Sequence, residues 1–235
     1  MPLDPDVRLD NPDCFDKRLD ETETKDYQSI VGSLMYAALG SRPDIAHAVA
    51  ILSRYASNPL EMHITAAKRV LRYLSRTRGH GIKFDGPGNF HGNLTLYTDA
   101  DWAGCRITRK SMNGCVAFLN GPVSWIAKAQ SVVALCTLES EYIASSEAVR
   151  EAVWLRLLLE SIDTATDGTC SCLDTSSPTK VFIDNQGALS AIKSGIIKSK
   201  TRHIEVKFHY VHDNNATKER LNSSTWLVQT TTRTS

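Results

Sequence analysis

The chain has 235 residues, of which 42% are hydrophobic, and its 27 basic and 26 acidic residues leave a formal net charge of +1. This balance excludes a field over the whole surface that attracts nucleic acid, so any such surface is a local patch. The sequence has no N-terminal signal pattern and no apolar run long enough to span a membrane. We therefore expect a cytoplasmic protein of one large or two small domains, with the nucleus as the alternative location.

The six cysteines show no paired spacing of the kind that zinc sites use, and they favour a reducing compartment. We interpret Cys115 and Cys136, which lie in apolar runs, as small core residues. Cys170 and Cys172 lie in a polar loop. A chance pair is favoured there over a metal site or a redox pair.

The first third of the chain predicts helices. Residues 1–24 are polar and proline-containing and predict an irregular lead-in. Residues 25–84 carry apolar side chains at helical spacing and predict a segment of three helices. We expect the first helix to end at Gly40, the second to have Pro43 in its first turn, and the third to be capped by Asn58.

Basic residues crowd the third predicted helix, namely Lys68, Arg69, Arg72 and Arg76. Basic side chains late in a helix complement its dipole, which is a purely structural explanation. The same spacing is also typical of a helix that follows a phosphate backbone. The pattern leaves both interpretations open.

A turn-rich segment at residues 85–93 predicts a domain boundary, after which the pattern changes to strands. We expect three strands in an antiparallel meander, which residues 131–136 complete or extend. A long helix follows over about 138–162, and then a short strand over 181–184 leads into another helix. The fold class predicted is therefore α/β, a mixed sheet flanked by helices, over residues 94–213.

Three acids lie at apolar positions, where burying an ionised carboxylate costs free energy. Asp99 and Asp184 each end an apolar strand, and Glu141 lies on the apolar face of the long helix. The neighbouring Glu139 lies on a mixed face and is interpreted as a first-turn acid that complements the helix dipole.

Carboxylates at close quarters repel one another unless divalent cations neutralise them. All-oxygen acidic sites suit Mg²⁺ or Mn²⁺, and two such ions can hold the attacking water and the leaving oxygen of a phosphodiester in line. The alternative is three unrelated acids, with Asp99 and Asp101 simply opening a turn.

Several longer motifs follow one another along the chain, namely Tyr27–Tyr36, Arg42–Ile45, Ala66–Leu74, Tyr97–Gly104, Arg109–Ser111, Val123–Trp125, Thr137–Ala144, Asp184–Gln186 and Lys200–Glu205. The order of strand-Asp, hairpins, helical Glu and strand-Asp is similar to ribonuclease H. The motifs themselves resemble the Ty1/copia retrotransposon Pol polyproteins over about residues 1–213. The first three resemble the region that joins reverse transcriptase to its ribonuclease H.

The resemblance implies a ribonuclease-H-like fold behind a helical connection segment. It implies that Asp99, Glu141 and Asp184 are the catalytic and metal-binding residues for Mg²⁺ or Mn²⁺, with Asp101 as the alternative to Asp99. The implied reaction is hydrolysis of the RNA strand of an RNA–DNA hybrid, in which the 2′-OH distinguishes RNA from DNA. The basic residues of the third helix would contact the hybrid. Reverse transcriptase and integrase parts of the same polyprotein are the implied protein partners, and no membrane is involved.

The C-terminal part departs from the family pattern. We expect residues 214–235 to be a degraded or truncated tail, with Trp226–Thr230 as the remnant of the last strand and without the family's fourth acid. Glu205 and Asp213 are candidates to replace that acid. The alternative function is thus an inactive retroelement remnant that at most binds nucleic acid. A zinc site from His203, His209 and His212 is disfavoured, because no fourth ligand is evident.

Overall fold

The computed structural model describes residues 1–4, 9, 17–84, 93–166, 178–194 and 226–230. The chain divides into two compact units, and each is described by itself. The first consists of Met1–Ile82, Cys105–Arg109 and Ala127–Ala129, and the second of Lys83–Gly104, Lys110–Ile126 and Gln130–Ser235. Across the described ranges, the helices are all too short or too polar to cross a bilayer.

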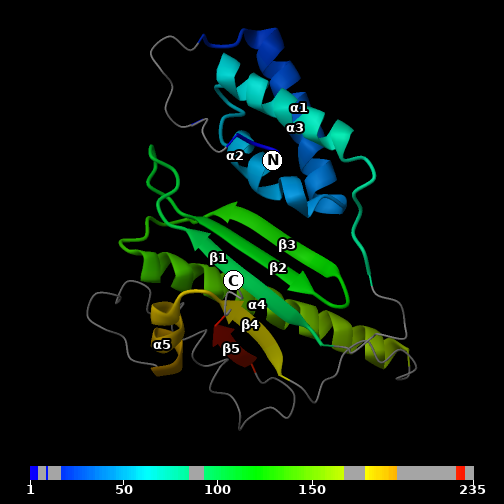
Figure 1. Ribbon diagram of the computed structural model, residues 1–235, viewed down its shortest axis with the longest axis vertical. Helices are drawn as coiled ribbons and strands as arrows, with labels where there is room; N and C mark the ends of the chain where they lie inside the picture. Colours follow the sequence, from blue (N-terminus) through cyan, green and yellow to red (C-terminus); the bar gives the residue numbers. More distant parts are fainter. Residues whose placement is uncertain (5–8, 10–16, 85–92, 167–177, 195–225, 231–235) are drawn as a thin grey trace. The chain divides into compact units, whose positions relative to one another are not determined.

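The first unit is built from helices (Figure 1). They are α1 (Glu21–Gly40), the short 3₁₀ helix η1 (Pro43–Ile45), α2 (Ala46–Ser53) and α3 (Glu61–Arg76). α1 ends at Gly40 as predicted, but it begins within the expected lead-in of residues 1–24. The reason is a capping box, in which Asp20 accepts the N–H of Glu23 and Glu23 accepts the N–H of Asp20.

Buried polar contacts fix how these helices join. The N-cap residue of α3 is Leu60 and not Asn58, so the helix begins two residues later than expected. The N–H of Leu60 donates to Nδ1 of the buried His63, so the other ring nitrogen of His63 donates to the carbonyl of Leu9. At the other end of α3, Arg42 donates to the carbonyl and hydroxyl oxygens of Thr77 and pairs with Asp44. The lead-in and the α1–α2 connection are thereby both tied to α3.

The second unit contains a five-stranded mixed sheet in the order β3-β2-β1-β4-β5, apart from Ala127–Ala129 at the end of β3 (Figure 1). Its strands are β1 (Thr95–Asp101), β2 (Met112–Phe118), β3 (Pro122–Ala129), β4 (Thr179–Ile183) and β5 (Trp226–Thr230). β1 is central and runs antiparallel to β2 but parallel to β4, which in turn is parallel to β5. This arrangement, with helices following the strands, is the ribonuclease-H-like α/β fold that the sequence predicted.

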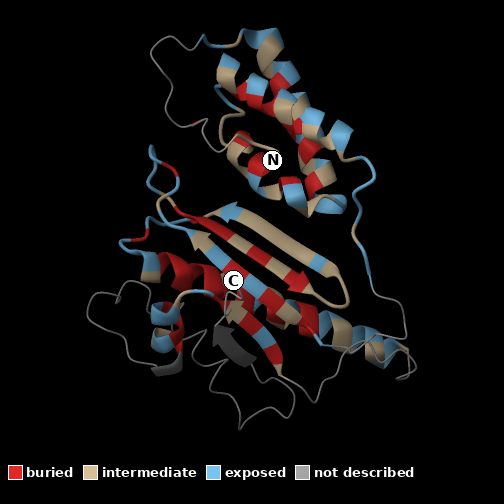
Figure 2. Ribbon diagram, viewed as in Figure 1, coloured by how far each residue is buried: buried red, intermediate tan, exposed pale blue. Residues whose placement is uncertain are grey.

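One long helix, α4 (Thr137–Ala165), packs against β1, β2 and β4 and also contacts α5 (Gln186–Ser194). The face predicted to be apolar is buried, since Ala144, Ala148 and Ala152 are at most 1% exposed. These small side chains let the helix axis approach the strands closely. Figure 2 shows that burial is concentrated in the N-terminal half of α4.

The structure corrects the prediction for residues 131–136. They form a loop and not a strand, because side chains bind their backbone in place of a neighbouring strand. The carboxylate of Glu139 accepts the N–H of Leu135, and the indole N–H of Trp102 donates to the carbonyl of Ala134. Cys136, expected in the core, is exposed at the N-cap of α4, whereas Cys115 is buried as predicted.

The strand that the sequence analysis expected within residues 214–235 is present in the structure. Trp226–Thr230 forms β5 and pairs in parallel with the whole of β4. The sheet therefore extends beyond residue 213, where the sequence analysis ended the domain. The five residues of β5 are those that the sequence analysis named as the remnant of the last strand.

We predict that Ala148→Leu lowers the free energy of unfolding by about 1–3 kcal/mol, the usual cost of overpacking a tight core. The added methyl groups push α4 away from the sheet, because Ala148 is fully buried. Urea unfolding followed by circular dichroism measures the change. Ala165→Leu, at the C-terminal end of the same helix, is the control, since Ala165 is exposed. An equal loss in both variants would contradict close packing at Ala148.

Candidate functional site

Strand register places two of the predicted acids side by side. β1 and β4 are parallel neighbours in which Thr98 pairs with Ile183. The next residues along the two strands are Asp99 and Asp184, so both carboxylates emerge where the parallel pairing of β1 with β4 ends. Asn185 then caps α5, because its side chain accepts the N–H of Ala188 at 2.9 Å. The backbone around Asp184 is thus fixed from both sides.

Glu141 comes from the second turn of α4 and is only 6% exposed. The close packing of α4 on the sheet brings this carboxylate to the two strand ends. One carboxylate oxygen from each of Asp99, Glu141 and Asp184 lies within 4.8 Å of the other two. The structure thus brings together three residues that are far apart in the sequence.

Asp101, the alternative to Asp99, does not join this group among the described residues. It is the last residue of β1, and its carboxylate folds over the turn that follows. A Cβ on Gly104 would lie 1.9 Å from Oδ2 of Asp101, so a side chain at position 104 would displace this carboxylate.

The electrostatics of the site centre on Glu141. Burial and then the nearby charges of Asp184 and Asp99 raise the pKa of Glu141 to about 8, while the backbone N–H of Ala100 opposes this rise. Oε2 of Glu141 is buried and has no hydrogen-bond partner among the described residues. Burying a carboxylate oxygen without a partner costs free energy, so a proton or a cation bound to this oxygen would stabilise the site.

The three acids fit a divalent cation. All three donors are carboxylate oxygens, the ligands that Mg²⁺ and Mn²⁺ prefer. The unpartnered oxygen of Glu141 supplies a position at which a cation would replace the missing hydrogen bond. Asp99, Glu141 and Asp184 are thus the residues that could hold a metal ion.

Glu139 has a different role from Glu141. It lies in the first turn of α4, as expected, but it is 1% exposed and not on a mixed face. Its carboxylate accepts the N–H of Leu135 at 2.7 Å and so binds the 131–136 loop to the start of the helix.

The sequence analysis did not single out a buried polar group beside the site. Gln130, Asn113 and Ser140 are each at most 7% exposed and are joined by hydrogen bonds. A polar Asn113 among the core-facing positions of β2 was the available indication, because Cys115 and Ala117 share that face.

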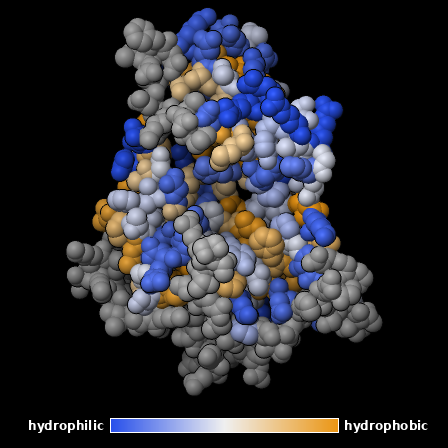
Figure 3. Space-filling view, viewed as in Figure 1, coloured by the Kyte–Doolittle hydropathy of each residue, from blue (hydrophilic) through white to orange (hydrophobic). Residues whose placement is uncertain are grey.

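The basic residues of α3 form a row on the first unit, whose surface is largely hydrophilic in Figure 3. Lys68, Arg72 and Arg76 are exposed, and the described residues place no acid within ion-pair distance of them. Arg69 differs, because its guanidinium pairs with the carboxylate of Asp4 at 2.6 Å. Three of the four predicted residues are therefore exposed to solvent, and the fourth already binds an anionic group.

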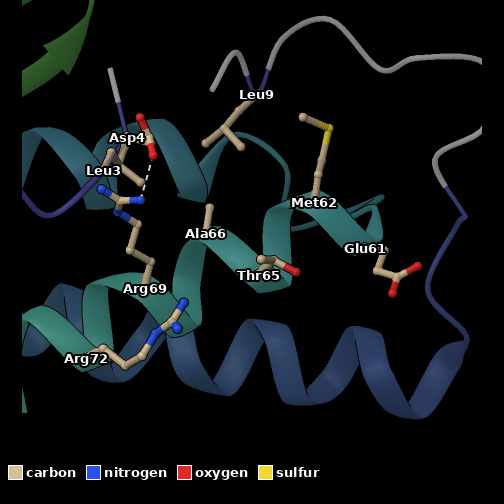
Figure 4. Close-up of a pocket in the computed structure, with 9 residues that line it drawn as sticks. All are labelled: Leu3, Asp4, Leu9, Glu61, Met62, Thr65, Ala66, Arg69 and Arg72. Atoms are coloured by element: carbon tan, nitrogen blue, oxygen red, sulfur yellow. Dashed lines mark hydrogen bonds and ion pairs between the residues drawn. The ribbon is translucent and has the colours of Figure 1, made fainter. Parts of the chain in front are cut away.

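A pocket of about 370 Å³ lies between α3 and the N-terminal residues Leu3, Asp4 and Leu9 (Figure 4). Leu3, Leu9 and Met62 contribute apolar side chains, and Arg69 and Arg72 contribute the cationic edge. Arg69 reaches across to Asp4, as the dashed line in Figure 4 marks. The contact shows that this edge of α3 accepts a carboxylate, which has the charge sign of a phosphate.

Several other residues of the sequence analysis lie outside the described ranges. They are Cys170, Cys172, His203, Glu205, His209, His212 and Asp213. Their predicted or disfavoured roles stay predictions.

The chain is similar to retrotransposon polyproteins. It is 39% identical over 188 residues to the "Retrovirus-related Pol polyprotein from transposon TNT 1-94" of Nicotiana tabacum, covering 80% of this chain and 13% of that protein. It is 35% identical over 193 residues to the corresponding polyprotein from transposon RE1 of Arabidopsis thaliana, covering 82% of this chain and 12% of that protein. The chain thus spans about an eighth of the length of these relatives.

A third relative is named "Secreted RxLR effector protein 161" of Plasmopara viticola and is 49% identical over 130 residues, which is 55% of this chain and 90% of that protein. No family model matches the chain. Among solved structures, ribonuclease H1 of the archaeon Halobacterium salinarum is similar with a TM-score of 0.39 and 13% identity, covering 60% of this chain and 87% of that one.

We predict that Glu141→Gln stabilises the metal-free protein at high pH. The folded-state pKa of Glu141 is raised from 4.5 to about 8, so its contribution to stability is complete below pH 4.5 and is lost as the pH rises through 8. Glutamine does not ionise, so it avoids this loss. Between pH 4.5 and pH 9, the free energy of unfolding of the variant should therefore rise relative to that of the parent by on the order of 4 kcal/mol. Urea unfolding in EDTA at the two pH values measures this. A difference that does not change with pH would contradict the raised pKa.

Proposed function

The chain belongs to the Ty1/copia-type retrotransposon Pol polyproteins, and from that premise we propose that its second unit hydrolyses the RNA strand of RNA–DNA hybrids. The observation that carries the proposal is the convergence of Asp99, Glu141 and Asp184 within 4.8 Å, where the parallel pairing of β1 with β4 ends. The ribonuclease-H-like fold supports it. Hydrolysis of a phosphodiester is the chemistry for which clustered carboxylates and divalent cations are suited.

Each acid has a definite part in this proposal. Asp99 and Asp184, both exposed, present carboxylates toward solvent where a substrate phosphate can approach. Glu141 faces the two aspartates from α4, and its buried Oε2, which has no other partner among the described residues, is the oxygen that would bind the cation. Bound Mg²⁺ or Mn²⁺ would neutralise the three charges and promote attack of water on the phosphate. We expect the RNA strand to be selected through its 2′-OH.

We further propose that the basic row of α3 binds the phosphate backbone of the nucleic acid. Lys68, Arg72 and Arg76 are exposed on one helix, and Arg69 already holds a carboxylate. A row of this kind adds affinity without sequence preference, because phosphates are the same at every position. Other parts of the polyprotein, reverse transcriptase and integrase, are the proposed protein partners.

A cleavage assay tests the catalytic proposal. The purified chain should cleave the RNA of a labelled RNA–DNA hybrid with Mg²⁺ or Mn²⁺ and not with EDTA. Asp184→Asn should lower the rate by at least about 100-fold, because a lost metal ligand costs more than the roughly 10- to 100-fold that a supporting residue costs. Asp101→Asn is the control, since this acid is exposed but lies outside the three-carboxylate group. Absence of cleavage by the folded parent would favour the inactive remnant.

A binding assay tests the basic row. Arg72→Glu should weaken binding of a hybrid about tenfold and reduce the slope of log K against log salt by about 1, because one phosphate contact is lost. Lys25→Glu on α1 makes the same change of charge on the same unit and should have a much smaller effect. Fluorescence anisotropy at several salt concentrations measures both quantities. Equal losses in the two variants would show that net charge alone matters.

A further inference from the structure

A buried polar network lies at the end of the sheet that carries the three acids, and Gln130 is its centre. The side chain of Gln130, which directly follows β3, is 3% exposed. Its Nε2 donates to Oδ1 of Asn113 on β2 at 2.6 Å and to the backbone carbonyl of Ser140 on α4 at 2.9 Å. One amide group therefore joins the sheet to the start of the long helix.

Both partners of this amide stand next to residues of the candidate site. Asn113 lies opposite Ala100 in the β1–β2 register, and Ala100 follows Asp99 and donates its N–H to the Asp99 carboxylate at 2.9 Å. Ser140 directly precedes Glu141 in α4. Gln130 therefore spans from the strand pair that carries one acid to the helical turn that carries another.

The backbone of Gln130 is itself anchored on the strand side. Its N–H donates to the carbonyl of Ser111 at 2.8 Å, and the Ser111 hydroxyl accepts the N–H of Ala103 at 3.1 Å in the turn after β1. Because the amide is fixed relative to β1 and β2, the hydrogen bond to Ser140 holds the start of α4 at a set position above these strands.

We propose that Gln130 is a positioning residue that holds Glu141 at its distance from Asp99 and thereby sets the affinity of the site for its divalent cation. The inference rests on the proposed function of the three acids. Metal affinity depends on ligands that are already in place, and hydrogen bonds to the elements that carry the ligands provide this order. Gln130 acts through the backbone of Ser140 and is not a ligand itself.

The chain contains a matched control on β3, the strand that Gln130 directly follows. The hydroxyl of Ser124 in β3 donates to Oε1 of Glu151 at 2.6 Å. Glu151 lies farther along α4 than Glu141 does. Ser124→Ala therefore also removes a side-chain hydrogen bond between the β3 segment and α4, but ten residues beyond Glu141 along the helix. A general weakening of the fold would affect both variants alike, whereas positioning of Glu141 involves only Gln130.

The test compares Mn²⁺ affinity by electron paramagnetic resonance titration, well below the unfolding temperature of each variant. Gln130→Met removes both donors and keeps an unbranched side chain of similar length. We expect Gln130→Met to bind Mn²⁺ about 10- to 100-fold more weakly, the range found for supporting residues of metal ligands, and Ser124→Ala to stay within about twofold of the parent. At saturating metal, the kcat of Gln130→Met for hybrid cleavage should return to the parent's value, because every ligand remains.

Three results would overturn the inference. They are an unchanged Mn²⁺ affinity in folded Gln130→Met, equal losses in Gln130→Met and Ser124→Ala, and a kcat that stays low at saturating metal. If Gln130→Met does not fold, Asn113→Ala removes one partner of the amide and should weaken Mn²⁺ binding by about 3- to 10-fold; an unchanged affinity there overturns it too. A parent that binds no Mn²⁺ overturns the proposed function itself, which is distinct from a parent that binds and a variant that binds equally well.

Discussion

Mutual repulsion of three carboxylates is the constraint on which the second unit depends. Parallel pairing of β1 with β4 sets Asp99 beside Asp184, and close packing of α4 adds a third carboxylate from Glu141. Burial and the two neighbouring charges raise the pKa of Glu141 to about 8, so the site binds a proton more tightly than an isolated glutamate does. The surrounding structure has to hold these groups together against their repulsion. It does so with a capped helix after Asp184, alanines under α4 and buried amide hydrogen bonds at the start of α4.

The sequence was informative wherever one physical requirement dominated. Alanines and leucines at helical spacing predicted which face of α4 is buried, and an acid on that face identified Glu141. The two strand-end acids were recognised because an ionised carboxylate at the end of an apolar strand is costly. The order of the strands did not follow from local pattern, since β4 and β5 join the sheet through contacts between distant segments.

The predictions failed where hydrogen bonds from side chains, and not from a neighbouring strand or helical turn, bind the backbone. Residues 131–136 have the apolar composition of a strand, yet the Glu139 carboxylate and the Trp102 indole bind their backbone as a loop. Glu139 was expected on a mixed face, but the first turns of α4 are buried on several sides, which periodicity calculated for one face does not reveal. The start of α1 was placed too late because the reciprocal bonds of Asp20 and Glu23 outweigh the polar composition of that segment.

The parallel pairing of β1 with β4 also has a consequence for how the protein is made. Thr98 and Ile183 are neighbours in the sheet, but β2, β3 and the whole of α4 lie between them in the chain. Closing so long a loop costs conformational entropy, and this cost slows the formation of parallel pairings between distant segments relative to hairpins and helices. On the ribosome, β1 and its hairpin partner emerge long before β4 is synthesised. The three acids therefore come together only once this long-range pairing has formed, and a chain without it carries an incomplete site.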